Sequence, residues 1–98
     1  MKDFFVYILK CSDDSYYIGH TDNIEHRISE HQLGLCSGYT SRRLPVHVVY
    51  IATFSSRIEA LEAERKLKKW TRAKKEALIN KCYDQLIYLA KCRNNKSR

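Results

Sequence analysis

The sequence lacks a long apolar run, a paired-cysteine motif and a linker that would divide it. No stretch approaches the roughly 18 consecutive apolar residues that span a bilayer, so we expect no membrane helix and no membrane partner. The N-terminus also lacks the layout of a secretory signal peptide, since Lys2 is followed directly by Asp3 and a strand-like segment. These absences predict a cytoplasmic protein.

The four cysteines are scattered along the chain without a C-x-x-C pair: Cys11, Cys36, Cys82 and Cys92. Structural zinc sites hold their ligands in close pairs, so this spacing argues against such a site. Without a secretory signal, we expect reduced thiols rather than disulfides. Cys11 and Cys82 are expected to be small core or half-buried residues.

The totals describe one ordinary globular domain with a basic surface. The 98 residues are enough for a single modest core, and 44% of them are hydrophobic and 30% charged. The net charge of +7 and the pI near 9.4 favour polyanionic partners.

Basic residues concentrate in one short segment around Trp70, the only tryptophan. Its seven cations are Arg65, Lys66, Lys68, Lys69, Arg72, Lys74 and Lys75. Such a cluster is typical of phosphate-backbone binding, with a solvated helix face as the alternative. Further cations lie at Arg42 and Arg43, in a predicted loop, and in the C-terminal tail, at Lys91, Arg93, Lys96 and Arg98.

Three strands are predicted from β-branched and aromatic runs. Residues 4–11 and 16–19 flank a polar turn and form a β-hairpin, and residues 46–54 form a third strand. Gly19 ends the second run, because no side chain fits there or because the backbone must approach something closely. Residues 35–45 are expected to form a loop.

Capping signals place the helices. Asp22 and Glu25 form a capping box for a helix that runs to about Gln32 and stops at Gly34. A second capping box, with Ser55 and Ser56 before Glu59, opens a helix to about Trp70. Thr71 then caps a third helix to about Asn80, and residues 86–90 add a short helix.

The predicted fold class is α+β: a small three-stranded antiparallel sheet packed by helices, in the order β-β-α-β-α-α with an extra C-terminal helix. Residues 1–80 form the core unit. Residues 81–98 form a helical extension and basic tail of the same single domain.

Charged side chains interrupt the apolar stripes of two predicted helices. His31 continues the face of Ile24 and Ile28, Arg27 shares that face, and Glu64 lies inside the apolar stripe of the second helix. Helices keep ionisable groups off a buried face unless these are paired or bound, because a desolvated charge is costly. These residues therefore predict an assembled polar site beside the strand tyrosines.

The same residues form an ordered motif. It comprises Val6-Tyr7, Tyr17-Ile18-Gly19, Arg27, His31 and Glu64. The order and spacing resemble the GIY-YIG nuclease superfamily, most closely its small stand-alone bacterial members, of the type shared with excision-repair and intron-encoded endonucleases. The resemblance covers about residues 4–80, including Tyr39-Thr40 and the segment 56–70. Phe5 stands where the first motif has glycine, a change that the small members tolerate.

The resemblance implies a metal-dependent endonuclease acting on DNA, in repair or in processing of branched or single-stranded DNA. Glu64 would be the metal ligand, for Mg²⁺ or Mn²⁺, and Arg27 would hold the scissile phosphate. Of Tyr7 and Tyr17, one would be a general base or orient water, and the other would contact phosphate. His31 would relay or accept a proton.

The nucleic-acid interface is expected at eight residues: Gly19, Tyr39, Arg42, Arg43, Lys68, Lys69, Trp70 and Arg72. DNA is the expected partner, and RNA is not excluded. No targeting domain is evident, so the chain's own surface or a protein partner must select the substrate, and branched, nicked or single-stranded DNA is expected to be preferred. The sequence does not indicate an oligomeric state.

Simpler interpretations remain open at each position. Arg27 can pair with Glu30, and Glu64 with Lys68; strand tyrosines and His31 can be packing residues. His20, His26 and His47 are read as surface or loop residues. Two other functions therefore stand beside the nuclease: a non-catalytic nucleic-acid-binding module on the same fold, and a protein-interaction domain with a basic surface.

Overall fold

The computed structural model describes the backbone of residues 2–36 and 38–91 and the side chains of residues 2–36 and 38–81. Its elements are β1 (Phe4–Lys10), β2 (Tyr16–Thr21), α1 (Ile24–Gln32), α2 (Gly38–Ser41), β3 (His47–Phe54), α3 (Arg57–Lys68) and α4 (Arg72–Lys91). The α+β class and the predicted order of elements are confirmed. The short helix α2 is an addition, inside the segment that was expected to be a loop.

β1 is the central strand of the antiparallel sheet, in the order β2-β1-β3. Tyr7 at its middle pairs with Gly19 of β2 on one side and with Ile51 of β3 on the other. β2 is therefore an edge strand, and Gly19 lies on that edge, beside Tyr7.

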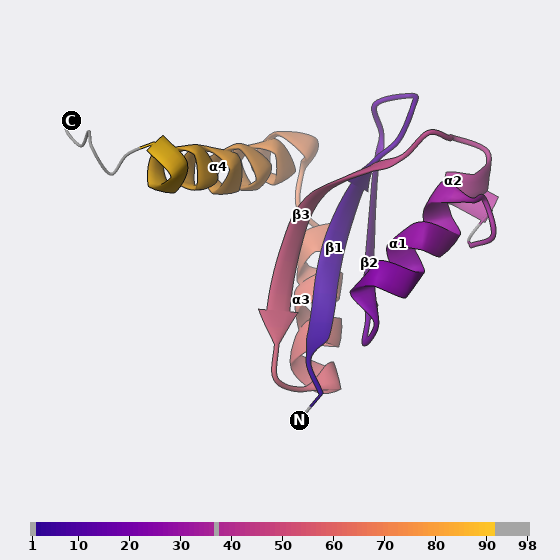
Figure 1. Ribbon diagram of the computed structural model, residues 1–98, viewed down its shortest axis with the longest axis horizontal. Helices are drawn as coiled ribbons and strands as arrows, with labels where there is room; N and C mark the ends of the chain where they lie inside the picture. Colours follow the sequence, from indigo (N-terminus) through magenta and orange to yellow (C-terminus); the bar gives the residue numbers. More distant parts are fainter. Residues whose placement is uncertain (1, 37, 92–98) are drawn as a thin grey trace.

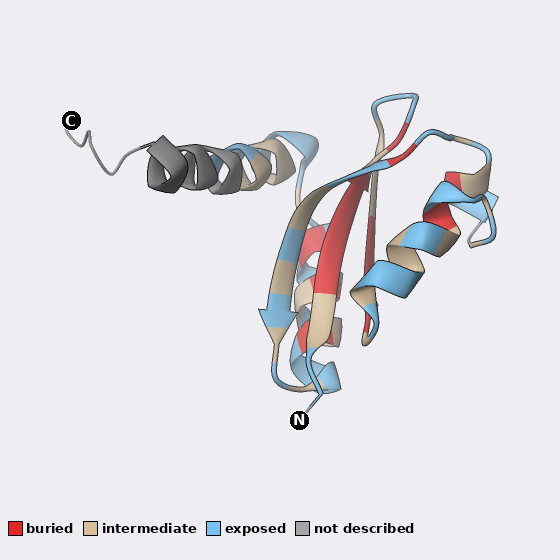
Figure 2. Ribbon diagram, viewed as in Figure 1, coloured by how far each residue is buried: buried red, intermediate tan, exposed pale blue. Residues whose placement is uncertain are grey.

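Helices α1 and α3 cover opposite faces of the sheet (Figure 1). Successive strand residues point to opposite faces, so β1 contributes to two apolar clusters. Val6 and Ile8 pack with residues of α3, whereas Tyr7 and Leu9 pack on the α1 side. Both faces of β1 are consequently buried (Figure 2).

The ends of α1 differ in part from the prediction. Asn23, rather than Asp22, is the N-cap, and its side chain accepts a hydrogen bond from the backbone N–H of His26. Asp22 instead forms ion pairs with Lys2 and Arg57, at 3.5 and 3.4 Å. Gly34 follows the helix with a φ of 77°, which confirms its predicted role as the stop.

The capping signals of the later helices are confirmed. Ser56 accepts a hydrogen bond from the backbone N–H of Glu59, and Thr71 accepts one from Lys74. The predicted third helix and the segment 86–90 form one continuous helix, α4, rather than two. α4 begins beside β3 and extends away from the sheet (Figure 1).

The cysteines and the absence of a membrane helix were also predicted from the sequence. No helix within the described residues is long and apolar enough to cross a membrane. Cys11 is buried, as expected, and both Cys11 and Cys36 are free thiols. The side chains of Cys82 and Cys92 and the basic tail beyond residue 91 lie outside the described residues. The boundary at residue 80 stays a prediction.

Candidate functional site

The centre of the candidate site is a chain of hydrogen bonds between two hydroxyl groups and an imidazole. The hydroxyl of Tyr7 lies 3.0 Å from Nε2 of His31, and Nδ1 of His31 lies 2.8 Å from Oγ1 of Thr40. All three side chains are essentially inaccessible to solvent. β1, α1 and α2 each contribute one of them. Three elements thus hold these hydrogen bonds in the core.

Burial and neighbouring side chains determine the protonation states of Tyr7 and His31. Burial, with a further contribution from Tyr17, raises the pKa of Tyr7 above its ordinary value, so its hydroxyl keeps its proton. Burial and the nearby charge of Arg27 lower the pKa of His31, so its imidazole is neutral at pH 7. A neutral imidazole accepts a hydrogen bond at one nitrogen and donates from the other, so His31 can link the two hydroxyl groups.

Tyr17 extends this arrangement toward the surface. Its ring centroid lies 5.1 Å from that of His31 and 6.5 Å from that of Tyr7. On its outer side lies the ring of Tyr39 from α2, at 5.9 Å. We call Tyr7, Tyr17, His31 and Thr40 the tyrosine–histidine cluster. Both motif tyrosines are therefore brought together with His31, as the sequence predicted.

Arg27 borders the tyrosine–histidine cluster from α1. Its guanidinium is close enough to the hydroxyl of Tyr7 to act against the rise in the pKa of that tyrosine. The predicted pairing with Glu30 is also present, with Nε of Arg27 3.2 Å from Oε1 of Glu30. That contact lacks hydrogen-bonding geometry and leaves Nε buried without a hydrogen-bond partner. The guanidinium is thus near Tyr7, and the Arg27 side chain as a whole is 40% exposed.

Gly19 explains why the hydroxyl of Tyr7 reaches the edge of the sheet. A Cβ atom at position 19 would lie 2.5 Å from the hydroxyl oxygen of Tyr7 and 2.8 Å from its Cζ. The ring of Tyr7 therefore lies directly over the backbone of the edge strand. The prediction that no side chain fits at Gly19 is confirmed.

Glu64 lies on the other face of the sheet, which the sequence did not reveal. It projects from α3 between the buried residues Ala60 and Leu67 and is 9% exposed. One carboxylate oxygen is hydrogen-bonded to Nδ1 of His20, and the other lies 2.6 Å from Nζ of Lys68. We call Glu64, His20 and Lys68 the glutamate cluster.

The charge of Glu64 is stabilised despite its burial. Burial alone would raise the pKa of this carboxyl, but hydrogen bonds from Lys68 and His20 outweigh it and hold the pKa below its usual value. The carboxylate is therefore ionised at neutral pH. The alternative pairing of Glu64 with Lys68 is present as well, so this residue has a structural partner in addition to its predicted role.

The two clusters meet at Gly19 and His20 of the edge strand β2. The hydroxyl of Tyr7 lies over Gly19, and Glu64 bonds to the next residue, His20. Consecutive Cα atoms are only about 3.8 Å apart, and consecutive side chains point to opposite faces. A group lying against this edge of β2 would be bordered by Tyr7 on one side and by Glu64 on the other.

Glu64 suits a divalent ion as a single carboxylate ligand. Mg²⁺ keeps several of its waters and often binds through one or two carboxylates together with substrate phosphate. The described side chains offer no group of three histidine, cysteine, aspartate or glutamate residues that could form a closed metal cage. The ionised Glu64 fits this open mode of binding, provided that the ammonium of Lys68 leaves its oxygen.

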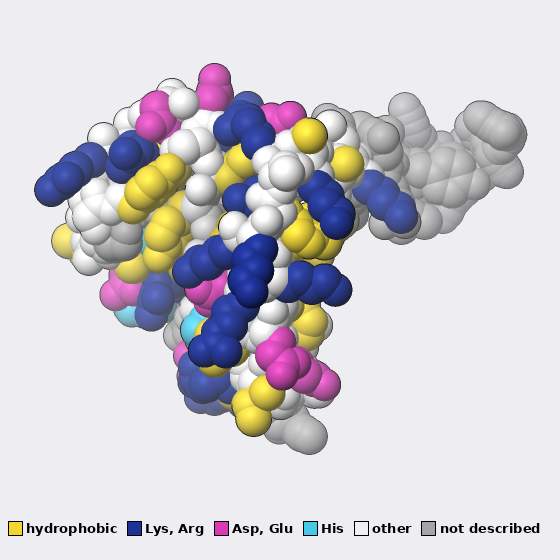
Figure 3. Space-filling view, turned by 180° about the vertical axis from the view of Figure 1, so that it is seen from behind, with side chains coloured by type: hydrophobic (Ala, Val, Ile, Leu, Met, Phe, Trp, Pro, Cys, Tyr) yellow, Lys and Arg dark blue, Asp and Glu magenta, His cyan; other side chains and the backbone are white. Residues whose placement is uncertain are grey.

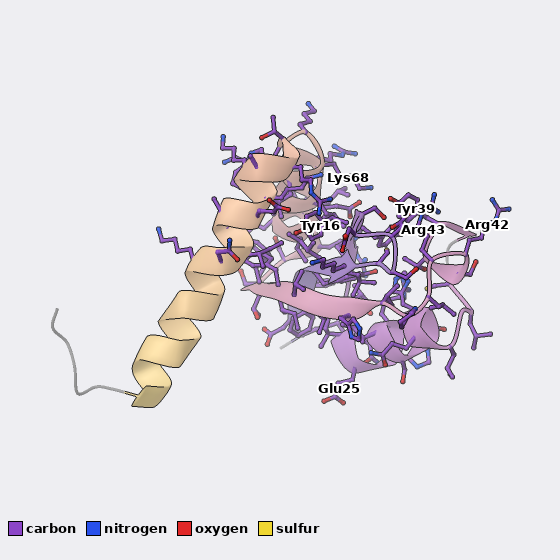
Figure 4. The ribbon with its side chains drawn as sticks, turned by 90° about the horizontal axis from the view of Figure 1, so that it is seen from above. Tyr16, Glu25, Tyr39, Arg42, Arg43 and Lys68 are labelled. Carbon is purple, nitrogen blue, oxygen red and sulfur yellow. The ribbon has the colours of Figure 1, made fainter. Side chains whose placement is uncertain are left out.

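Arg42 and Arg43, both predicted to bind nucleic acid, differ sharply. Arg43 donates from Nε to Asp13 at 2.9 Å and from Nη1 to the carbonyl of Tyr39 at 2.9 Å, and its guanidinium stacks 3.9 Å from the centroid of the Tyr39 ring. Arg42 is exposed and extends away from the molecule, whereas Tyr39 and Arg43 lie together (Figure 4). Arg43 thus supports Tyr39 and the β1–β2 turn, and Arg42 is available to a phosphate.

Replacing these arginines by alanine is expected to affect two different properties, the stability of the fold for Arg43 and the binding of DNA for Arg42. Arg43→Ala should lower the melting temperature by about 5 °C, because three contacts of one side chain are lost. Arg42→Ala should leave the melting temperature unchanged and weaken DNA binding at low salt. Thermal melts and salt titrations of both variants measure this. Equal melting temperatures for the two variants would refute the structural role of Arg43.

The other predicted contact residues lie on the α3 side. Lys69 is exposed at the end of α3, and Arg72 pairs with Glu76 at 2.9 Å while its guanidinium lies 4.6 Å from the centroid of the Tyr16 ring. Trp70 is half-buried, with Nζ of Lys74 4.6 Å from its ring centroid. Seen from this side, lysine and arginine side chains surround hydrophobic ones (Figure 3). The eight predicted contacts therefore fall into two groups separated by the sheet, with Gly19 between them.

Two residues of the candidate site were missed in the sequence. His20 was read as a surface or loop residue, but it is a partly buried residue of β2 bonded to Glu64. Strand alternation contained a signal, because His20 follows Gly19 and must point to the face opposite Tyr17. Thr40 lies in the short helix α2, and nothing in the sequence indicated its bond to His31.

Comparisons with known proteins identify the family. The family described as the GIY-YIG catalytic domain matches residues 3–77. A UPF0213 protein of Natronomonas pharaonis is 42% identical over 77 residues, covering 79% of this chain and 91% of its own. A UPF0213 protein of Staphylococcus aureus is 43% identical over 79 residues, covering 81% and 96%.

Two solution structures are similar as well. That of a UPF0213 protein from Bacillus halodurans has a TM-score of 0.54 and 38% identity, covering 80% of this chain and 83% of its own. That of a protein from E. faecalis has a TM-score of 0.58 and 37% identity, covering 85% and 88%.

Proposed function

Because the chain belongs to the GIY-YIG family, as a small member similar to UPF0213 proteins, we propose that it is a metal-dependent endonuclease that hydrolyses phosphodiester bonds in DNA. The observation that carries this proposal is the buried hydrogen-bonded chain of Tyr7, His31 and Thr40, which ends at the edge of β2. Packing alone does not require three polar side chains in the core, because each must be matched to a partner to avoid a desolvation penalty.

In the proposed reaction, Tyr7 and His31 move one proton. Nδ1–H of His31 donates to Thr40, which leaves Nε2 as the acceptor for the hydroxyl proton of Tyr7. As water attacks the phosphorus, its proton would pass to the oxygen of Tyr7 while the proton of Tyr7 passes to Nε2. Because Tyr7 is only 1% exposed, this step requires that substrate binding admit one water to the Tyr7 oxygen. The phosphorus–oxygen bond to the leaving group breaks, and the leaving oxygen takes the electron pair and later a proton from solvent.

Charge on the phosphate is neutralised from two sides. Arg27, a partly exposed cation beside Tyr7, would hold a non-bridging oxygen. A Mg²⁺ or Mn²⁺ ion held by Glu64 would supply positive charge to the phosphate and the leaving oxygen. His20 keeps the carboxylate of Glu64 oriented toward the edge of β2. Tyr17 packs against His31 and contacts phosphate in this scheme.

Cleavage of labelled DNA tests the proposal. With Mg²⁺ or Mn²⁺, the wild-type chain is expected to cut branched, single-stranded or duplex DNA, and Glu64→Ala should lower the rate by about 100-fold because the metal ligand is lost. Glu62→Ala is the matched control, since Glu62 is an exposed glutamate of the same helix and should cut at the wild-type rate. Cleavage by Glu64→Ala at the wild-type rate would refute the role of Glu64.

The second candidate function is a non-catalytic nucleic-acid-binding module. The basic surface around Trp70 favours it, as does the occupation of both Glu64 oxygens by His20 and Lys68. Salt-sensitive DNA binding without cleavage by the wild-type chain would favour this function over the nuclease. Binding to neither DNA nor RNA would instead favour a protein-interaction domain.

A further inference from the structure

The α3 face of the sheet carries an apolar pocket that the nuclease proposal does not use. It has a volume of about 160 Å³, and its lining includes the rings of Tyr50, Phe54 and Trp70. The small side chains of Ala52 and Ala63 also line it, as does Lys66. Pockets for whole small ligands usually exceed about 300 Å³, so this one suits a single planar ring system.

The pocket and the glutamate cluster lie on opposite flanks of α3. The pocket is formed between α3 and β3, whereas Glu64 bonds to His20 of β2, at the other edge of the sheet. Successive residues of a helix point about 100° apart, so Ala63 and Glu64 face different directions although they are adjacent in sequence. The pocket is therefore a binding site separate from the glutamate cluster.

The charges around the pocket match a nucleic acid strand. Lys66 borders it, Nζ of Lys74 lies 4.6 Å from the centroid of the Trp70 ring, and none of its described lining residues is acidic. Hydrophobic side chains on this face are bordered by lysine and arginine (Figure 3). Aromatic rings that stack on bases, beside cations that bind phosphates, are the usual means of binding single-stranded nucleic acid. An apolar peptide would need a longer groove for its repeated anchors.

We propose that this pocket binds one unpaired nucleobase, so that the chain acts on nucleic acid that contains an unpaired base. The proposal rests on the proposed function and specifies its substrate class. Bases inside a duplex are stacked on both faces and cannot enter, whereas bases in flaps, bulges and single strands can. The pocket thereby gives a physical reason for the preference for branched or single-stranded DNA expected from the sequence.

Trp70 makes the proposal directly measurable, because it is the only tryptophan of the chain. Its intrinsic fluorescence is expected to be quenched by a short single-stranded oligonucleotide, but not by a duplex of the same sequence or by an abasic oligomer with the same phosphates. Quenching by the abasic oligomer to the same extent would overturn the proposal, because phosphate contacts alone would then explain the signal.

Filling the pocket gives a second, independent test. Ala52→Leu is expected to weaken single-strand binding by about tenfold, through loss of base stacking. Ala73→Leu makes the same change at an exposed position of α4 and should bind like the wild type. Trp70→Leu, followed by anisotropy of a labelled oligonucleotide, should weaken binding to a similar extent if its melting curve shows a folded chain. Unchanged binding in both Ala52→Leu and Trp70→Leu would overturn the proposal.

The outcomes separate this proposal from the nuclease proposal. If cleavage requires Glu64 but proceeds equally on duplex and single strands, and Ala52→Leu has no effect, the pocket proposal fails and the nuclease stands. If the wild-type chain neither binds nor cuts any nucleic acid, both proposals fail. Glu64-dependent cleavage that favours unpaired bases and is weakened by Ala52→Leu supports both.

Discussion

Tyr7→Phe is expected to lower the rate of DNA cleavage by about 100- to 10,000-fold while leaving the chain folded and able to bind DNA. The substitution removes only the hydroxyl, which is the group hydrogen-bonded to Nε2 of His31 at 3.0 Å and directed to the edge of β2. General acid–base catalysis contributes a rate factor of this size. The ring remains in the core, so the main structural loss is one hydrogen bond, about 1 kcal/mol.

Tyr16→Phe is the matched control for this substitution. Tyr16 is also a tyrosine of the hairpin, but its side chain points to the α3 side and its hydroxyl donates to Glu76 at 3.3 Å. Its loss should leave the cleavage rate within about twofold of wild type. If Tyr7→Phe lowers kcat while KM is unchanged, the hydroxyl acts in the transition state. A full rate in Tyr7→Phe would refute the proton path through His31.

The same proton path predicts the pH dependence of cleavage. Only neutral His31 accepts the proton of Tyr7, and burial together with Arg27 lowers the pKa of His31 below its ordinary value of 6.5. The rate should therefore stay level down to neutral pH and fall only at pH values below 6.5. Folding stability should also decline below pH 6.5, because the unfolded chain protonates His31 more readily than the folded chain. Melting curves at each pH separate the two effects.

The strands and the capped helices were predictable because their signals are local. Alternation and β-branched runs identified the hairpin, and Ser56 and Thr71 acted as caps as their sequence contexts predicted. The cap of α1 was wrong by one residue, because Asp22 is engaged by two cations from distant segments, Lys2 and Arg57. Such long-range ion pairs have no signature in the local sequence.

The candidate site was predictable by residue and not by geometry. Helical periodicity showed that His31 and Glu64 lie on buried faces of their helices, and both are buried. Periodicity does not show which face of the sheet a helix covers, so it could not show that His31 and Glu64 lie on opposite faces of the sheet. The contacts of Thr40 and His20 depend on that same packing. The sequence was therefore enough to predict which residues form the candidate site. Only the structure shows that they form two clusters on opposite faces of the edge strand β2.

Gly19→Ala is expected to be as damaging to cleavage as the loss of the Tyr7 hydroxyl, although glycine 19 performs no chemistry. The new Cβ would lie 2.5 Å from the hydroxyl oxygen of Tyr7 and 2.8 Å from Cζ. Tyr7 is 1% exposed, so its ring is enclosed by core residues and can move only if they move as well. Either the ring shifts away from His31 or β2 separates from β1. We expect a loss of stability of about 1–3 kcal/mol and a fall in the cleavage rate of at least about 100-fold.

Gly38→Ala is the matched control, because a Cβ at position 38 meets no atom within 4 Å. In helix α2 alanine is favoured over glycine, so this variant should be neutral or more stable by up to about 1 kcal/mol.

A double variant tests the cause: in a Tyr7→Val background the large ring is absent, and Gly19→Ala should then cost little further stability. Denaturant titrations of the four chains measure this coupling. If Gly19→Ala costs the same with and without the ring of Tyr7, the close approach of the two residues does not explain the glycine. A coupling of the expected size would show that the glycine serves to let Tyr7 reach the edge where both clusters meet.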